Sequence, residues 1–89
     1  MRKHYNITIK GRVQGIGFRY NAKRQALALG LDGFVKNMPD GSVYVETEGN
    51  PTAMDEFVSW CQEGPSGARI IEVNVSISNL EGLTGFTAY

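Results

Sequence analysis

The chain has 89 residues, which is enough for one small domain with a hydrophobic core. Nine Lys and Arg residues balance nine Asp and Glu residues, so no net field attracts nucleic acid or an anionic membrane. The single cysteine, Cys61, excludes an internal disulfide, and no apolar run approaches the ~20 residues of a membrane span. The first residues also lack the apolar segment of a signal peptide. We therefore expect a monomer with a single domain over residues 1–89, located in the cytoplasm, with no nucleic-acid or membrane partner.

The first half of the chain predicts a strand, a helix and a pair of strands. Residues 5–9 alternate between apolar and polar side chains, which indicates a strand with one buried face that ends near Val13. Apolar side chains at helical spacing predict a helix over residues 18–29. Residues 31–37 and 42–48 flank a Met-Pro-Asp-Gly turn, so we expect them to form two antiparallel strands.

The second half predicts another helix and another strand. Asn50 followed by Pro51 is typical of a helix N-terminus, and Gly64 with Pro65 marks the end of that helix. Residues 71–77 alternate and predict a strand. The order strand, helix, strand, strand, helix, strand predicts a two-layer α+β sandwich of the ferredoxin-like βαββαβ type. We expect a mainly antiparallel sheet, two helices on one face and a short C-terminal strand.

Three charged or titratable side chains are expected on the face of the sheet that the helices leave open. His4 has the parity opposite to the apolar residues of its strand and lies near the N-terminus, so we expect it to be exposed. Glu46 and Glu48 share one face of their strand, which we interpret as a solvated face. No group of His, Cys, Asp and Glu residues has the spacing of metal ligands, so we expect no metal and no cofactor.

The segment Gly-Arg-Val-Gln-Gly-Ile-Gly-Phe-Arg, residues 11–19, has the features of an anion site. It leads from a strand through a glycine-containing loop into a helix, where the first N–H groups lack intrahelical partners and face the positive end of the helix dipole. Glycine allows a positive φ and a close approach to a ligand, and an arginine in the first helical turn adds a bidentate cation. We expect phosphate, or sulfate as a competing anion, to bind at Gln14, Gly15, Ile16, Gly17, Phe18 and Arg19.

The same loop lacks the residues of other phosphoryl-transfer mechanisms. It holds no Ser, Cys or His to act as a nucleophile, and no Lys-Ser or Lys-Thr pair follows the glycines as in nucleotide-binding P-loops. Direct attack by water is therefore the simpler route. Asn37 ends the second predicted strand, and right-handed crossover connections allow it to lie close to the loop.

The segments 11–19 and 33–37, the latter followed by Asp40-Gly41, resemble the acylphosphatase family, and the similarity extends over nearly the whole chain. The resemblance implies a metal-independent enzyme that hydrolyses small acyl phosphates to carboxylate and inorganic phosphate. It also implies that Arg19 binds the phosphoryl group and that Asn37 orients the attacking water. Departures from the family pattern occur at Phe34, Lys36, Asn21-Ala22 and the C-terminal Phe-Thr-Ala-Tyr.

Two alternatives share the same order of elements. One is a non-catalytic binding or regulatory module of ferredoxin-like fold, but RNA readers of this type present aromatic and basic residues on the open face. Here the first strand offers only Asn6, Thr8 and Lys10 on that face, and the third strand only Tyr44 as an aromatic. The other is the acylphosphatase-like domain of a hydrogenase-maturation protein that handles carbamoyl phosphate.

Overall fold

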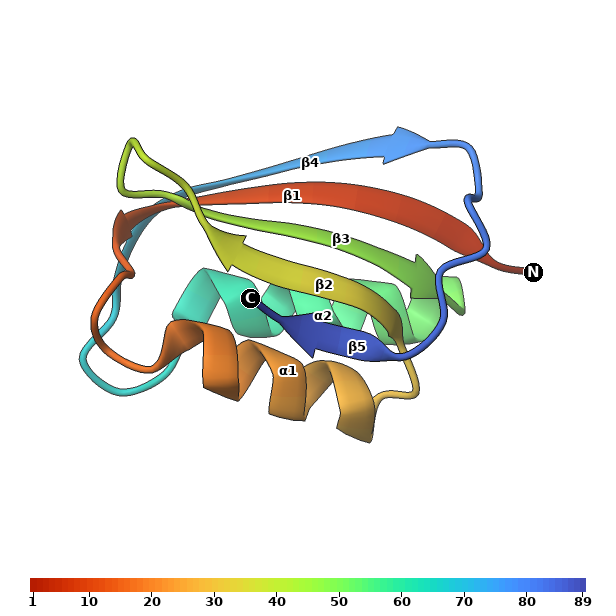
Figure 1. Cartoon of the computed structure of the whole chain (residues 1–89), viewed down its shortest axis with the longest axis horizontal. Helices are drawn as coiled ribbons and strands as arrows, with labels where there is room; N and C mark the ends of the chain where they lie inside the picture. Colours follow the sequence, from red (N-terminus) through yellow and green to blue (C-terminus); the bar gives the residue numbers. More distant parts are fainter.

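The computed structural model describes all residues from Met1 to Tyr89 and contains two helices packed on one face of a five-stranded sheet (Figure 1). The elements, in chain order, are β1 (Lys3–Arg12), α1 (Phe18–Ala28), β2 (Asp32–Asn37), β3 (Val43–Gly49), α2 (Pro51–Glu63), β4 (Arg69–Ser78) and β5 (Phe86–Ala88). The predicted ferredoxin-like fold class is confirmed, including the short last strand. Neither helix combines the length and apolar character needed to cross a membrane.

The sheet has the order β4-β1-β3-β2-β5. The first four strands pair antiparallel, whereas β5 pairs parallel with β2, so the sheet is mixed. The parallel pair places Phe86 beside Gly33 and Ala88 beside Val35. The end of the chain therefore lies next to β2, the strand that carries Asn37.

The core lies between the sheet and the helices, as the alternation of apolar residues predicted. Ile7 and Ile9 of β1 and Val45 of β3 are fully buried. Each helix presents a stripe of buried side chains to the sheet, and these are Phe18, Ala22 and Ala26 of α1 and Met54, Phe57 and Cys61 of α2. Strand β4 lies at an edge of the sheet, and its apolar residues Ile71 and Ile77 are largely exposed.

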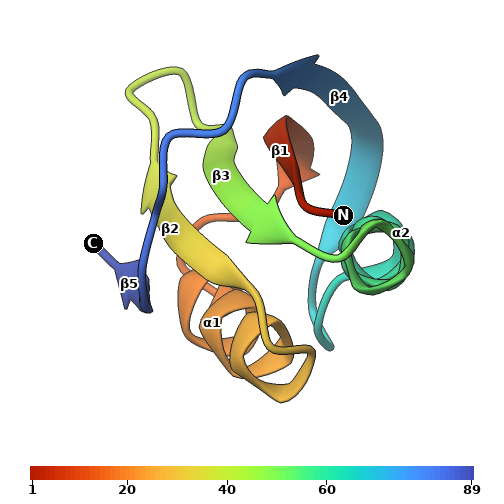
Figure 2. The ribbon, with the colours of Figure 1, turned by 90° about the vertical axis from the view of Figure 1, so that its right-hand side faces the viewer.

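The expectation of a solvated His4 and Glu48 is wrong, because a loop covers them. Strands β4 and β5 lie at opposite edges of the sheet, so the connection through residues 79–85 must cross the face that the helices leave open (Figure 2). Glu48 accepts hydrogen bonds from the backbone N–H groups of Glu81 and Leu83 in this loop. His4 and Glu48 are consequently buried, with 0% and 1% exposure, while the side chain of Glu46 keeps 21%.

Candidate active site

The loop from Val13 to Gly17 joins β1 to α1 and ends in an open helix N-terminus. Gly15 and Gly17 have φ angles of 77° and 79°, in the left-handed region that favours glycine. Gly17 is the N-cap of α1, and the helix has neither a side-chain cap nor an acidic residue in its first turn. The first N–H groups of α1 therefore have no side-chain acceptor, and the positive end of the helix dipole is uncompensated.

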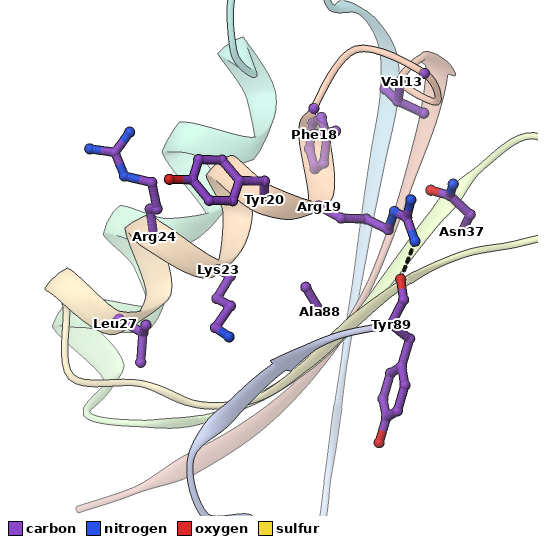
Figure 3. A pocket seen from close by; sticks show the side chains of 12 residues that line it. Val13, Phe18, Arg19, Tyr20, Lys23, Arg24, Leu27, Asn37, Ala88 and Tyr89 are labelled. Carbon is purple, nitrogen blue, oxygen red and sulfur yellow. Dashed lines mark hydrogen bonds between the residues drawn. The ribbon is translucent and has the colours of Figure 1, made fainter.

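A pocket of about 570 Å³ lies at this N-terminus (Figure 3). Its walls are the loop, the exposed face of α1, the end of β2 and the end of the chain. The pocket is lined by Val13, Gly15, Gly17, Phe18, Arg19, Tyr20, Lys23, Arg24, Leu27, Asn37, Ala88 and Tyr89. Of the residues that the sequence singled out, the pocket thus brings together Gly15, Gly17, Phe18, Arg19 and Asn37.

Arg19 reaches across the pocket from the first turn of α1 to the end of the sheet. The Nη1 group of Arg19 donates to the main-chain oxygen of Tyr89, and the Tyr89 N–H donates in turn to the Val35 carbonyl at 2.9 Å. Figure 3 shows the guanidinium group between Tyr89 and the amide of Asn37. A guanidinium has five N–H donors, so this contact orients Arg19 and leaves donors for an anion in the pocket.

Gln14 and Ile16 do not line the pocket, although the sequence placed them in the anion site. The side-chain amide of Gln14 donates to the carbonyls of Met38 and Ser42, at 2.8 and 2.9 Å, and so ties the loop to the β2–β3 turn. Ile16 is partly buried and packs against the core. Gln14 thereby links the loop to the segment that directly follows Asn37.

The pocket concentrates positive charge in a chain whose net charge is zero. Arg19, Lys23 and Arg24 line it, and no Asp or Glu does. Sequence reasoning missed four of the lining residues on α1, namely Tyr20, Lys23, Arg24 and Leu27, because it followed only the buried stripe of the helix. Their spacing of three, four and seven residues is that of one helical face, so the same pattern contained the signal. Ala88 and Tyr89 gave no such signal, because their position depends on which sheet edge β5 joins.

The departures from the family pattern leave the pocket largely unchanged. Lys36 lies with its Nζ 5.9 Å from the ring centroids of both Phe34 and Tyr44, and neither Phe34 nor Lys36 lines the pocket. Asn21 donates from its side chain to the Gly17 carbonyl at 2.9 Å, which supports the first turn of α1. Of these positions only the C-terminal Ala88 and Tyr89 are part of the pocket wall.

Replacing Gly15 with valine should damage anion binding more than folding. A β-branched residue resists a φ of 77°, and its side chain would crowd the pocket that Gly15 lines. The strain itself costs about 1–2 kcal/mol. We expect the inhibition constant for inorganic phosphate to rise at least ~10-fold, measured as competition against an aryl acyl phosphate.

Gly82→Val is the matched control, because Gly82 has a φ of 76°, has no atom near the position of an added Cβ, and does not line the pocket. It should lower the thermal stability about as much as Gly15→Val without changing phosphate inhibition. Equal phosphate inhibition in the two folded variants would contradict an anion site in the loop.

Comparison with known proteins agrees with this geometry. The acylphosphatase family model matches residues 5–88. The chain is 45% identical to an acylphosphatase of Nocardioides sp. over 97% of its own length and 87% of that protein. The crystal structure of acylphosphatase from Bacillus subtilis superimposes with a TM-score of 0.95 at 37% identity, covering 100% of this chain and 99% of that one. A structure of full-length HypF in its phosphate- and nucleotide-bound form matches with a TM-score of 0.90 at 27% identity, but the match spans only 12% of that chain. The chain belongs to the acylphosphatase family.

Proposed function

We propose that the chain hydrolyses the carboxyl–phosphate bond of small acyl phosphates, and that it does so without a metal ion. The observation that carries the proposal is the composition of the pocket: an uncapped helix N-terminus, Arg19 and the Asn37 amide face one space that no Asp or Glu lines. This arrangement suits a dianionic phosphoryl group. Loose phosphoryl-transfer transition states depend chiefly on positioning and charge stabilisation, which these groups supply.

In the proposed reaction the phosphoryl group binds to Arg19 and to the N–H groups of the loop and first helical turn. The Asn37 side chain holds a water molecule in line with the scissile bond. The water oxygen forms the new bond to phosphorus, the bond from phosphorus to the acyl oxygen breaks, and the electron pair leaves with the carboxylate. The carboxylate is a good leaving group, so no general acid is needed, and a phosphate oxygen accepts the water's proton. No Ser, Cys, His, Asp or Glu side chain lines the pocket to form a covalent intermediate.

We infer that the chain acts as a monomer, with residues 1–89 forming one catalytic domain in the cytoplasm. Inorganic phosphate and sulfate compete with the substrate, because they match the charge and size of its phosphoryl group. No other partner is required by the reaction.

The test is hydrolysis of an aryl acyl phosphate in ¹⁸O-labelled water, with and without a chelator. We expect turnover that the chelator does not change and label that appears only in the inorganic phosphate. Label in the carboxylate would show attack at the carbonyl carbon and would contradict the role proposed for Asn37. Phosphate binding without turnover would instead favour the non-catalytic binding module.

A further inference from the structure

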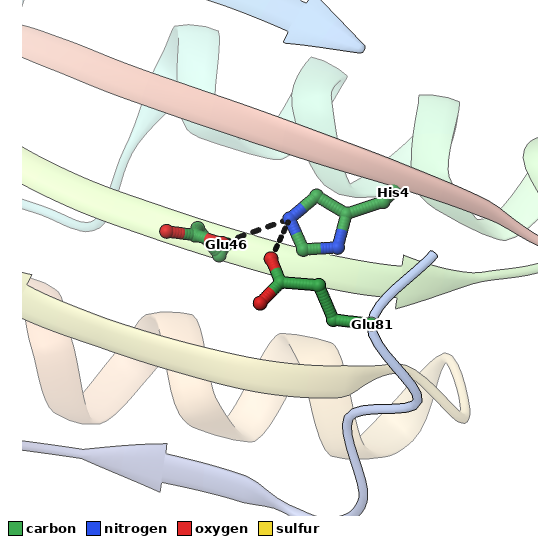
Figure 4. A group of neighbouring side chains, drawn as sticks. All are labelled: His4, Glu46 and Glu81. Atoms are coloured by element: carbon green, nitrogen blue, oxygen red, sulfur yellow. Dashed lines mark hydrogen bonds and ion pairs between the residues drawn. The ribbon is translucent and has the colours of Figure 1, made fainter. Parts of the chain in front are cut away.

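The most concentrated group of titratable side chains outside the pocket lies beneath the loop that crosses the open face of the sheet. It consists of His4 on β1, Glu46 and Glu48 on β3, and Glu81 in residues 79–85, and we call it the His4 cluster. Figure 4 draws His4, Glu46 and Glu81. The β1–β3 register places His4 directly opposite Glu48. Because cross-strand partners share a face, the side chains of the two strands converge, and the loop supplies Glu81 from above.

The two nitrogens of the His4 ring have different surroundings. Nδ1 contacts a Glu48 oxygen at 2.7 Å, and Glu48 is held by the loop N–H groups of Glu81 and Leu83. Nε2 faces three oxygen acceptors, at 2.9 Å from Glu46, 3.1 Å from Asn6 and 3.5 Å from Glu81. A ring nitrogen carries at most one hydrogen, so Nε2 cannot donate to all three. The position in front of Nε2 therefore has more electron-pair donors than protons.

The charges of the cluster are also unbalanced. It contains three carboxylates and one imidazole, and neither Lys nor Arg forms an ion pair with Glu46, Glu48 or Glu81. Both Glu48 oxygens are already occupied, one by the His4 ring and the Glu81 N–H and the other by the Leu83 N–H. Even a protonated imidazole leaves the cluster with an excess of negative charge, which a divalent cation would neutralise.

We propose that the His4 cluster binds one divalent transition-metal ion of the Zn²⁺ type through His4 Nε2, Glu46 Oε1 and Glu81 Oε2. These three atoms lie within 4.8 Å of one another. In a tetrahedral zinc site with bonds of ~2.0–2.1 Å, ligand atoms stand about 3.3 Å apart. The separations from Nε2 to Glu46 and Glu81, 2.9 and 3.5 Å, bracket that value, so small side-chain adjustments suffice.

The surroundings of the three ligands fit such a site. Glu48 accepts from Nδ1–H, so the ring keeps that proton when a metal ion displaces the Nε2 proton, which is the arrangement that carboxylates commonly give zinc-bound histidine. The Tyr44 hydroxyl donates to the other Glu46 oxygen at 2.9 Å and orients that carboxylate. Glu81 is 57% exposed, so an ion can arrive from solvent on its side. One imidazole with two carboxylates favours a transition metal over Mg²⁺ and Ca²⁺, which prefer all-oxygen sites.

The bound ion would fasten the crossing loop to β1 and β3 and would take no part in hydrolysis. The cluster lies where His4 pairs with Glu48 near the start of β1, whereas the pocket lies beyond the other end of that strand. An ion that binds the folded chain but not the unfolded chain raises the stability of the folded chain by mass action. The inference is thus independent of the proposed reaction.

The test is titration of chelator-treated full chain with Zn²⁺, followed by calorimetry and by thermal unfolding. We expect saturable binding of one ion per chain and a rise in Tm of ~5 °C or more at saturation, with no such rise in Mg²⁺. Glu81→Gln keeps the backbone N–H that holds Glu48 but removes a ligand, and it should weaken Zn²⁺ binding at least ~10-fold. Glu46→Gln should do the same and provides a second variant if the first proves unstable.

Glu72→Gln is the matched control, because Glu72 is also a half-exposed carboxylate near a single charged partner, Lys10, at 3.8 Å. It should bind Zn²⁺ as the parent chain does. The proposal is overturned if the parent chain binds no stoichiometric Zn²⁺, if Glu81→Gln and Glu46→Gln bind it unchanged, or if Mg²⁺ raises the Tm equally.

Discussion

Replacing Arg19 with alanine should lower kcat/KM for an aryl acyl phosphate by at least ~100- to 1,000-fold, equivalent to ~2.7–4 kcal/mol of transition-state stabilisation. Arg19 lies in the first turn of α1 beside the uncapped N–H groups, and Tyr89 holds its guanidinium toward Asn37. A charged bidentate donor contributes at least as much as one neutral donor of an oxyanion site. Initial rates and the inhibition constant of inorganic phosphate, measured together, check the expectation, and both should deteriorate.

Two further variants separate the loss of charge from the loss of geometry. Arg19→Lys retains the charge but not the planar fork, so it should recover only part of the activity. Lys23→Ala removes another cation that lines the pocket from the next turn of α1, and it serves as the control for a general loss of positive potential. If Lys23→Ala were as inactive as Arg19→Ala, the specific role of Arg19 would be refuted.

Asn37→Ala should reduce kcat by ~100-fold or more while the phosphate inhibition constant changes less than ~3-fold. The amide is proposed to orient the attacking water and not to hold the bound anion. An interaction that matters only in the transition state appears in kcat, whereas uniform binding appears in KM. Steady-state kinetics and phosphate inhibition on the folded variant provide the measurement.

Asn37→Asp sharpens the same test. The carboxylate of this variant can still accept a hydrogen bond from water, but it places a negative charge in a pocket that no acidic side chain lines in the parent chain. We expect it to be inactive and also to bind phosphate more weakly than Asn37→Ala does. Near-normal turnover of Asn37→Ala would mean that Asn37 only supports the adjacent turn.

The sequence predicted those parts of the fold that depend on local patterns. Alternation in β1 and the helical stripe of α2 follow from the periodicity of strand and helix, and their observed bounds agree closely with the expected ones. The anion loop could also be recognised from a local pattern, because its glycines and arginine are adjacent in the chain at a strand–helix junction. The role of the Gln14 side chain could not be predicted in this way, since its acceptors Met38 and Ser42 lie in a turn that only the fold brings near.

The burial of His4 and the place of Tyr89 in the pocket have a common origin in strand β5. A three-residue strand has little pattern of its own, and nothing in its residues states which edge of the sheet it joins. Because it joins β2, the preceding loop crosses over His4 and buries it, and Tyr89 reaches Arg19. The expectation of an exposed His4 used strand parity correctly but assumed that the face opposite the helices was uncovered.

The path of the crossing loop also limits how the chain length can change. From Ser78 to Phe86 the chain has eight links, whose full reach is about 29 Å, and it must pass over four strand spacings of ~4.8 Å, or about 19 Å, while rising above the side chains of the sheet. Little slack remains in residues 79–85. A deletion of two or three residues there would pull β5 from β2 and withdraw Tyr89 from Arg19, whereas an insertion outside Glu81–Leu83, the segment that holds Glu48, only lengthens a surface loop at small entropic cost. Although residues 79–85 lie far from the pocket, the fold should thus tolerate such an insertion in this segment but not a deletion.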